Sequence, residues 1–180
     1  MVGRMTDPRM RPAILDDADA IAAVHHTAWV QTYSHLLPAG HWESDTVARR
    51  RERWRDQLSG EASGRPLVAV VDQDVVGFAR AGATRGKDGV PPVRADELWA
   101  LYVVAVHHGT GVGTVLLDAV LPSRRPAELW GVAVVRSEEC QDERVTVRED
   151  PVYGPRGAQK LSRRDPMCDM PLQEHRDLIV

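Results

Sequence analysis

The chain has 180 residues, of which 43% are hydrophobic and 27% charged, and its formal net charge is −3 at pH 7. That length suits one domain with a tail, and the composition excludes wholesale disorder, collagen and coiled coil. The small negative charge gives no global reason to bind nucleic acid. No apolar run approaches the roughly 20 residues that span a bilayer. We therefore expect a cytoplasmic protein that binds neither nucleic acid nor membranes.

From residue 10 to 92 the pattern predicts a strand (10–13), a helix (16–30), a helix break (36–40) and a second helix (44–58). A hairpin of two strands (67–71 and 75–81) and a surface loop (82–92) follow. The first helix would begin at Asp16 or Asp17, which both suit an N-cap. The arginines of the second helix fit a solvated face, with anion steering as the alternative.

The next residues predict a buried strand (97–104) and a glycine-rich turn (108–113). The turn leads into a helix that ends at residue 121, and a last apolar strand covers 127–135. The residues expected to face the core from the three helices are Ile21, Val24, Ala28, Val47, Trp54, Leu58, Leu116, Leu117, Val120 and Leu121.

The periodicity ends near residue 135. From 136 to 180, 18 of 45 residues are charged and four prolines are scattered among them, which predicts a disordered or weakly ordered tail. We therefore divide the chain into an N-terminal extension (1–9), a domain (10–135) and an atypical tail (136–180).

The glycine-rich turn is the most informative segment for function. It reads His108-Gly109-Thr110-Gly111-Val112-Gly113-Thr114, lacks the Lys-Ser/Thr of a P-loop and does not fit G-x-G-x-x-G. Glycines let the backbone bend close to a ligand, and the N–H groups at a helix N-terminus attract phosphate. On these grounds alone a plain tight turn and a pyrophosphate-binding loop are equally good interpretations.

In its context the turn resembles the pyrophosphate loop of the GNAT superfamily of N-acetyltransferases. That loop reads Gln/Arg-x-x-Gly-x-Gly/Ala after the fourth strand, and this sequence departs from it only at His108. The flanking Leu101-Tyr102-Val103 and Leu116-Leu117, and the segment 29–38, are similar to bacterial members. The resemblance covers about residues 10–135. It implies an α/β (α+β) fold, with a mixed, mostly antiparallel central sheet flanked by helices and followed by the atypical tail.

The resemblance implies acetyl-CoA as the acetyl donor. Its pantetheine arm would pair with the main chain of Val103 and Val104. Its pyrophosphate would lie on the loop, whose contacting residues would be His108, Gly109, Thr110, Gly111, Val112, Gly113 and Thr114. The amine of a small molecule or peptide would attack the thioester directly, so the protein must remove a proton and stabilise an oxyanion.

Three further residues are candidates for the acceptor side of the reaction. Glu97 occupies a fourth-strand position that carries the general base in some family members, but with Asp96 it could equally form a polar strand entrance. Trp29 and Tyr33 either line the acceptor pocket or belong to the core.

The resemblance ends after Trp130. Family members usually continue into a helix with an Asn-x-x-Ala-x-x-Phe-Tyr-x-x-x-Gly-Phe pattern, which this chain lacks. The general acid therefore stays unassigned, with Tyr102 or water near the thiolate. We hypothesise that the segment from about Gly131 onward is translated in a shifted frame or has been replaced. One face and an edge of the sheet would then be exposed, which favours aggregation or pairing with a second copy as a homodimer. The alternative function is a catalytically impaired acyl-CoA-binding or interaction module.

A metal site is not expected. The seven histidines include the adjacent pairs 25–26 and 107–108, whose side chains diverge on a helix or strand, and no H-E-x-x-H occurs. Cys140 and Cys168 form no CxxC pair.

Overall fold

A hairpin and its neighbouring strands form the centre of the fold. The computed structural model describes residues 7–34, 39–60, 64–86, 90–121, 126–131 and 145–149. The strands, in the order β1-β2-β3-β4-β5-β6, are hydrogen-bonded neighbours in one sheet. The described residues belong to two compact units. Unit 1 draws on 1–80 and 101–120, and unit 2 on 81–100 and 121–179.

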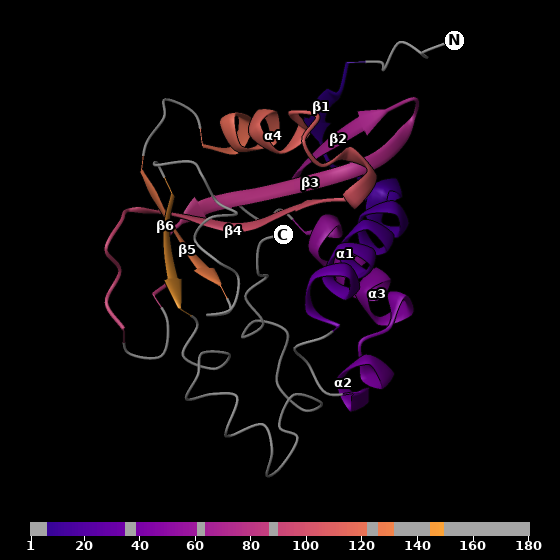
Figure 1. Cartoon of the computed structure of the whole chain (residues 1–180), viewed down its shortest axis with the longest axis horizontal. Coiled ribbons are helices and arrows are strands. Elements are labelled where there is room, and N and C mark those ends of the chain that lie inside the picture. Colours follow the sequence, from indigo (N-terminus) through magenta and orange to yellow (C-terminus); the bar gives the residue numbers. More distant parts are fainter. Residues whose placement is uncertain are drawn as a thin grey trace. The chain divides into compact units, whose positions relative to one another are not determined.

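Strands β1 (Arg9–Pro12), β2 (Leu67–Val71) and β3 (Asp74–Ala83) pair antiparallel in succession. Asp72 and Gln73 both have positive φ (48° and 76°), as a tight two-residue hairpin requires. Strand β4 (Asp96–Val103) runs opposite to β3 (Figure 1). The predicted hairpin and the predicted mostly antiparallel, mixed fold are confirmed.

Helices α1 (Ala18–Tyr33) and α3 (Val47–Ser59) pack side by side in unit 1 (Figure 1). The predicted inner faces of both helices are buried, apart from Val47, which is half-buried. Their contact is strengthened by Arg50 of α3, whose guanidinium lies 5.2 Å from the centre of the Trp29 ring. Arg50 itself is buried and bonds to the Asp45 carboxylate at 2.9 and 2.5 Å. The prediction of a solvated arginine face is thus wrong for this residue.

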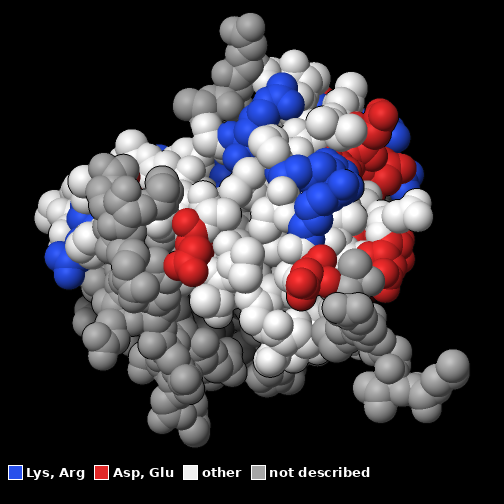
Figure 2. Space-filling view, turned by 90° about the horizontal axis from the view of Figure 1, so that it is seen from above, with Lys and Arg blue, Asp and Glu red and all other residues white. Residues whose placement is uncertain are grey.

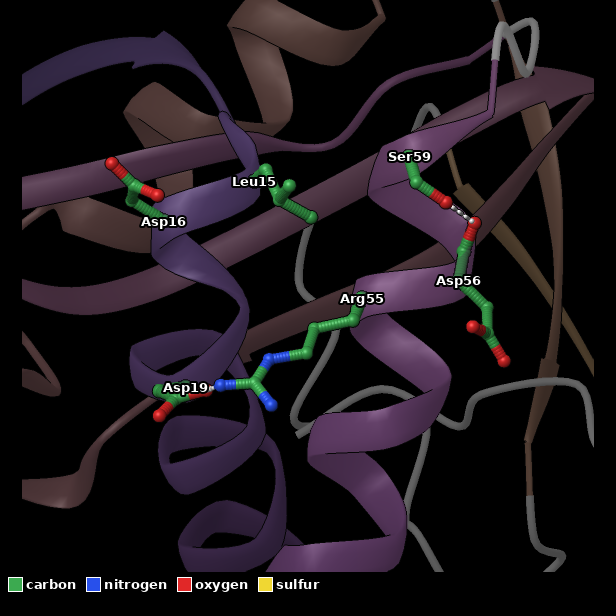
Figure 3. A pocket seen from close by; sticks show the side chains of 6 residues that line it. All are labelled: Leu15, Asp16, Asp19, Arg55, Asp56 and Ser59. Atoms are coloured by element: carbon green, nitrogen blue, oxygen red, sulfur yellow. Dashed lines mark hydrogen bonds and ion pairs between the residues drawn. The ribbon is translucent and has the colours of Figure 1, made fainter.

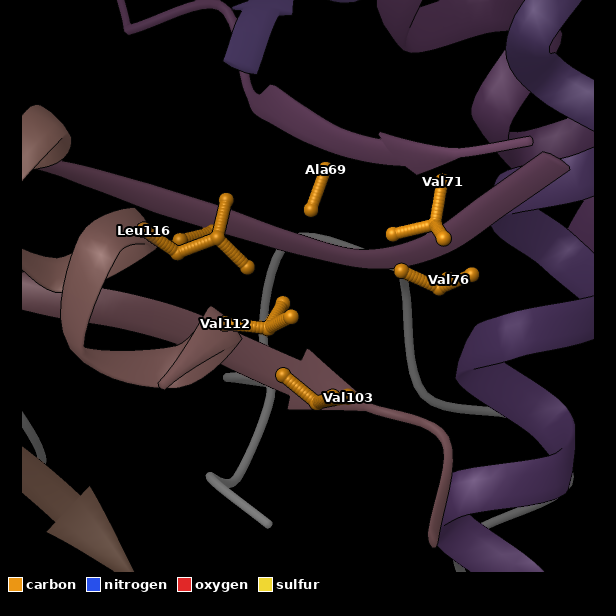
Figure 4. Close-up of a cluster of buried hydrophobic side chains, with 7 residues drawn as sticks. Ala69, Val71, Val76, Val103, Val112 and Leu116 are labelled. Atoms are coloured by element: carbon orange, nitrogen blue, oxygen red, sulfur yellow. The ribbon is translucent and has the colours of Figure 1, made fainter. Parts of the chain in front are cut away.

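Helix α4 (Val112–Val120) packs on the strands of unit 1. Leu116 and Val112 meet valines of β2, β3 and β4 in one buried cluster, which comprises Ala69, Val71, Val76, Ala79, Val103, Val112 and Leu116 (Figure 4). Gly77 makes this approach possible. A Cβ there would lie 2.7 Å from the Tyr102 carbonyl oxygen, closer than packed atoms tolerate, and in a tight contact at 3.3 Å with Leu116 Cδ1.

In unit 2, strand β5 (Ala127–Gly131) pairs parallel with β4, where Glu97 lies opposite Glu128, and with β6 (Val145–Glu149). Gly82 of β3 lies against Trp99, and a Cβ there would be 2.4 Å from the indole. The sequence placed Gly82 in a loop, but β3 continues through it because the missing side chain makes room for the Trp99 ring.

Two other expectations need correction. Helix α2 (Ala39–Ser44) begins inside the predicted helix break, and β6 lies inside the predicted tail. Asp17 occupies the N-cap position of α1, as predicted, but its side chain makes no capping hydrogen bond to this helix. Its carboxylate accepts bonds from the Ile14 amide (2.8 Å) and the Arg11 guanidinium (2.6 and 2.7 Å). Residues 132–135 of the last predicted strand and most of the tail lie outside the described residues.

Candidate functional site

The turn between β4 and α4 is built from a short 3₁₀ segment, η2 (Ala105–His107), and two glycines with left-handed backbone. Gly109 has φ 71° and Gly111 φ 88°, and a Cβ at either position would meet nothing within 4 Å. These glycines are therefore required by backbone conformation and not by crowding. Residues 108–111 are exposed. The predicted glycine turn is present, and its main chain is accessible.

The turn is followed directly by the N-terminus of α4. The first bond of this helix runs from Val115 N to Gly111 O at 3.1 Å. The amides of Val112, Gly113 and Thr114 precede that bond and so have no carbonyl in the helix to donate to. Thr114 and Gly111 are exposed, Gly113 is half-buried and Val112 is buried in the core. Such a terminus carries a positive dipole end that favours anions.

Val103 and Val104, at the end of β4, use their main-chain groups differently. Val104 N donates to Val76 O of β3 at 3.0 Å, and Val104 O accepts from His107 N at 2.9 Å. Because N–H and C=O groups alternate between the two sides of a strand, those of Val103 point away from β3. The Val103 carbonyl oxygen lies 2.7 Å from His108 Nε2.

Trp29 and Tyr33 belong to a buried aromatic cluster of unit 1. Tyr33 packs on Trp29 with ring centroids 4.6 Å apart, and both side chains are buried. His25 of α1 lies 6.3 Å from Trp29 and 4.6 Å from Tyr102. This geometry matches the core interpretation more closely than an open pocket wall. Tyr102, suggested near the thiolate, lies in the same cluster.

His25 is a residue whose place the sequence did not reveal. Its Nδ1 lies 3.3 Å from Trp54 Nε1, which can only donate. His25 Nδ1 is therefore the acceptor, and the bond ties α1 to α3. Spacing on α1 alone could have placed His25 beside Ile21 and Val24, but its partner on α3 is 29 residues away.

Glu97, the candidate general base, is only 1% exposed. Its Oε2 accepts from the Arg85 amide at 2.9 Å, and its Oε1 accepts from Arg85 Nη2 at 2.8 Å. The Arg85 guanidinium also lies 4.6 Å from the centre of the Trp99 ring. Glu97 therefore anchors the segment after β3 through an ion pair.

Glu128 is a second buried carboxylate in unit 2, and it is not among the residues predicted from the sequence. It is fully buried. Its Oε1 accepts from Thr84 Oγ1 at 2.5 Å, and its Oε2 accepts from Val93 N at 3.0 Å. A glutamate within the apolar run of β5 was the available signal. Glu97 and Glu128 together hold both ends of the segment between β3 and β4.

Elsewhere in unit 1 some of the charged side chains form ion pairs. Arg51 and Arg55 reach Asp19 at 3.2 and 3.1 Å, and Figure 2 shows basic and acidic side chains side by side on one face. A surface hollow nearby is lined by Leu15, Asp16, Asp19, Arg55, Asp56 and Ser59 (Figure 3). Its acidic side chains make it a poor site for pyrophosphate.

Two features are absent from the described part of the chain. Within those residues, no three histidine, cysteine or acidic side chains gather as metal ligands would. No helix there has both the length and the apolar character needed to cross a membrane.

The sequence is similar to known acetyltransferases. The sequence profile of the Acetyltransferase (GNAT) family matches residues 23–141. The uncharacterized N-acetyltransferase YuaI of Bacillus subtilis (strain 168) is 29% identical over 114 residues, which are 60% of this chain and 59% of YuaI. The chain thus matches less than two thirds of that relative's length.

A solved structure supports the fold. The PaiA N-acetyltransferase of Thermoplasma acidophilum, in complex with coenzyme A, aligns with a TM-score of 0.50 and 18% identity over 63% of this chain and 69% of its own. The profile match runs from α1 through the glycine turn and β5, well over half of the sequence. The chain belongs to the GNAT family of acetyltransferases.

Proposed function

We propose that this chain transfers the acetyl group of acetyl-CoA to a primary amine, which attacks the thioester directly. The observation that carries the proposal is the exposed turn at Gly109 and Gly111, which leads into the N-terminus of α4 within the family match. Main-chain donors at a helix N-terminus are suited to the two phosphates of the donor. The amides from Gly109 to Thr114 would hold them.

Glu97 is our candidate for the general base. A carboxylate offers about four acceptor positions, and Arg85 occupies two of the positions on Glu97. In this proposal the other positions would serve an ammonium group or a bridging water that reaches the buried side chain. Arg85 would keep the carboxylate oriented while it accepts the proton. The general acid is not assigned.

The acceptor in this proposal is a small-molecule or peptide amine, and the reaction takes place in the cytoplasm, where we also expect a homodimer. Trp29 and Tyr33 would then support the wall of the acceptor site indirectly, through the aromatic cluster in which both are buried.

Binding is tested first, by calorimetric titration of the full chain with acetyl-CoA. Gly111→Val should weaken binding about tenfold or more, since a β-branched residue strongly disfavours the left-handed backbone at φ 88°. Gly86→Val is the matched control. It places valine at φ 61° in unit 2, and should leave the affinity unchanged. Failure of the unmodified chain to bind acetyl-CoA would reject the proposal.

Turnover is tested by thiol release with a panel of amines. Glu97→Gln should lower kcat about 100-fold or more. Glu128→Gln, at the partner position of the neighbouring strand, should lower kcat much less. Binding of acetyl-CoA without turnover of any amine would favour the alternative, a catalytically impaired acyl-CoA-binding module.

A further inference from the structure

We propose that the His108 side chain competes with the pantetheine arm of the donor for the carbonyl oxygen of Val103, and so limits the affinity for coenzyme A. His108 Nε2 lies 2.7 Å from this oxygen. The inference rests on the proposed function. It assigns His108 a role opposite to that of a phosphate ligand, which its position in the turn would otherwise suggest.

The main chain at the end of β4 leaves one residue to meet an extended ligand. Both main-chain groups of Val104 are used within the fold, by Val76 and by His107. The groups of Val103 point away from β3, because the N–H of the next residue, Val104, donates to β3. Pantetheine pairing proposed for these two residues therefore depends on Val103, whose carbonyl is the acceptor that His108 already uses.

The chemistry of the contact fixes the direction of the hydrogen bond. A carbonyl oxygen can only accept, so Nε2 must carry the hydrogen. Both the neutral Nε2–H tautomer and the charged imidazolium can donate in this way. Protonation would therefore not release His108, and a competing donor is needed. An amide N–H of the pantetheine arm is such a donor.

The turn is held by other bonds that do not involve this side chain. His107 N donates to Val104 O at 2.9 Å, and His108 N donates to Ala105 O at 3.0 Å. Thr110 Oγ1 donates to His107 O at 2.7 Å. The imidazole can therefore leave Val103 while the turn keeps its main-chain geometry. Loss of the His108 side chain should therefore change ligand binding without changing the structure of the turn.

The test is calorimetric titration of the full chain and of His108→Ala with two ligands, coenzyme A and adenosine 3′-phosphate 5′-diphosphate, which keeps the diphosphate but lacks the pantetheine arm. One hydrogen bond between neutral groups corresponds to about a two- to tenfold change in a binding constant. We expect His108→Ala to bind coenzyme A tighter by about that factor and to bind the second ligand with unchanged affinity. His108→Phe, which keeps a ring but lacks the donor, should behave alike.

His107→Ala is the matched control, since it removes the adjacent imidazole without touching Val103. It should change the affinity for coenzyme A less than about twofold. The inference is overturned if His108→Ala binds coenzyme A with equal or weaker affinity, which would mean that the two donors share the carbonyl or that His108 contacts phosphate. It is also overturned if both ligands gain equally. Absence of coenzyme A binding to the unmodified chain would instead reject the proposed function.

Discussion

Three glycines around the β4–α4 turn should respond differently to the same substitution by alanine. At Gly77, the added Cβ would lie 2.7 Å from the Tyr102 carbonyl oxygen and 3.1 Å from Val103 Cγ2. At Gly111 it would meet nothing within 4 Å, but φ is 88°. At Gly113, in the first turn of α4, it would make an ordinary contact with Val103 Cγ2 at 4.0 Å.

The magnitudes follow from these differences. Overpacking a core position costs about 1–3 kcal/mol, and the close neighbour of Gly77 is backbone that cannot rotate away. We expect Gly77→Ala to lose that much free energy of unfolding. Gly111→Ala should lose about 1–2 kcal/mol through its left-handed backbone alone. Gly113→Ala should be neutral or more stable by up to about 1 kcal/mol, because alanine favours a helix over glycine.

Urea unfolding followed by tryptophan fluorescence measures all three variants, with the slope of each transition compared as well as its midpoint. Because the three changes are chemically identical, differences in midpoint report local geometry. A Gly77→Ala variant as stable as the original chain would refute the close packing of α4 against β3 and β4. A Gly113→Ala variant that loses as much free energy of unfolding as Gly77→Ala would refute the assigned start of α4.

Three further predictions concern unit 1. The Arg11 guanidinium holds the pKa of Asp17 below its ordinary value of 3.8. This stabilisation is complete above the ordinary pKa and is lost as the pH falls through the lowered one, so urea midpoints at pH 7 and pH 3 should differ less for Arg11→Met than for the original chain. Asp45→Ala should lower the free energy of unfolding by about 3–5 kcal/mol, because it leaves the Arg50 charge buried without a partner carboxylate. Adding Arg50→Met should restore the thermal stability in full. A thermal unfolding midpoint for Asp45→Ala equal to that of the original chain would contradict this prediction. Thr46→Ala removes the N-cap of α3, a 3.3 Å bond, and should cost about 0.5–1 kcal/mol by the same unfolding assay, with no change counting against the cap.

Local pattern was sufficient for the elements that carry the proposed cofactor site. The run from Val75 and the Asp72-Gln73-Asp74 turn predicted the hairpin, and the glycines before α4 predicted its turn, since each signal lies within a few residues. Helix α2 was missed because Pro38 and Gly40 read as a break. Gly82 was read as a loop because the reason for that glycine is Trp99, 17 positions later.

The sequence by itself determined the turn between β2 and β3, the apolar faces of the helices, and the glycine turn before α4, because these depend on residues close in sequence. Tertiary structure alone decided the partners of the buried polar groups: Glu97 with Arg85, Glu128 with Thr84, and His25 with Trp54. A buried polar group must find a hydrogen-bonding partner wherever folding brings one within reach. Separations of 12, 44 and 29 residues leave no periodic trace of that choice.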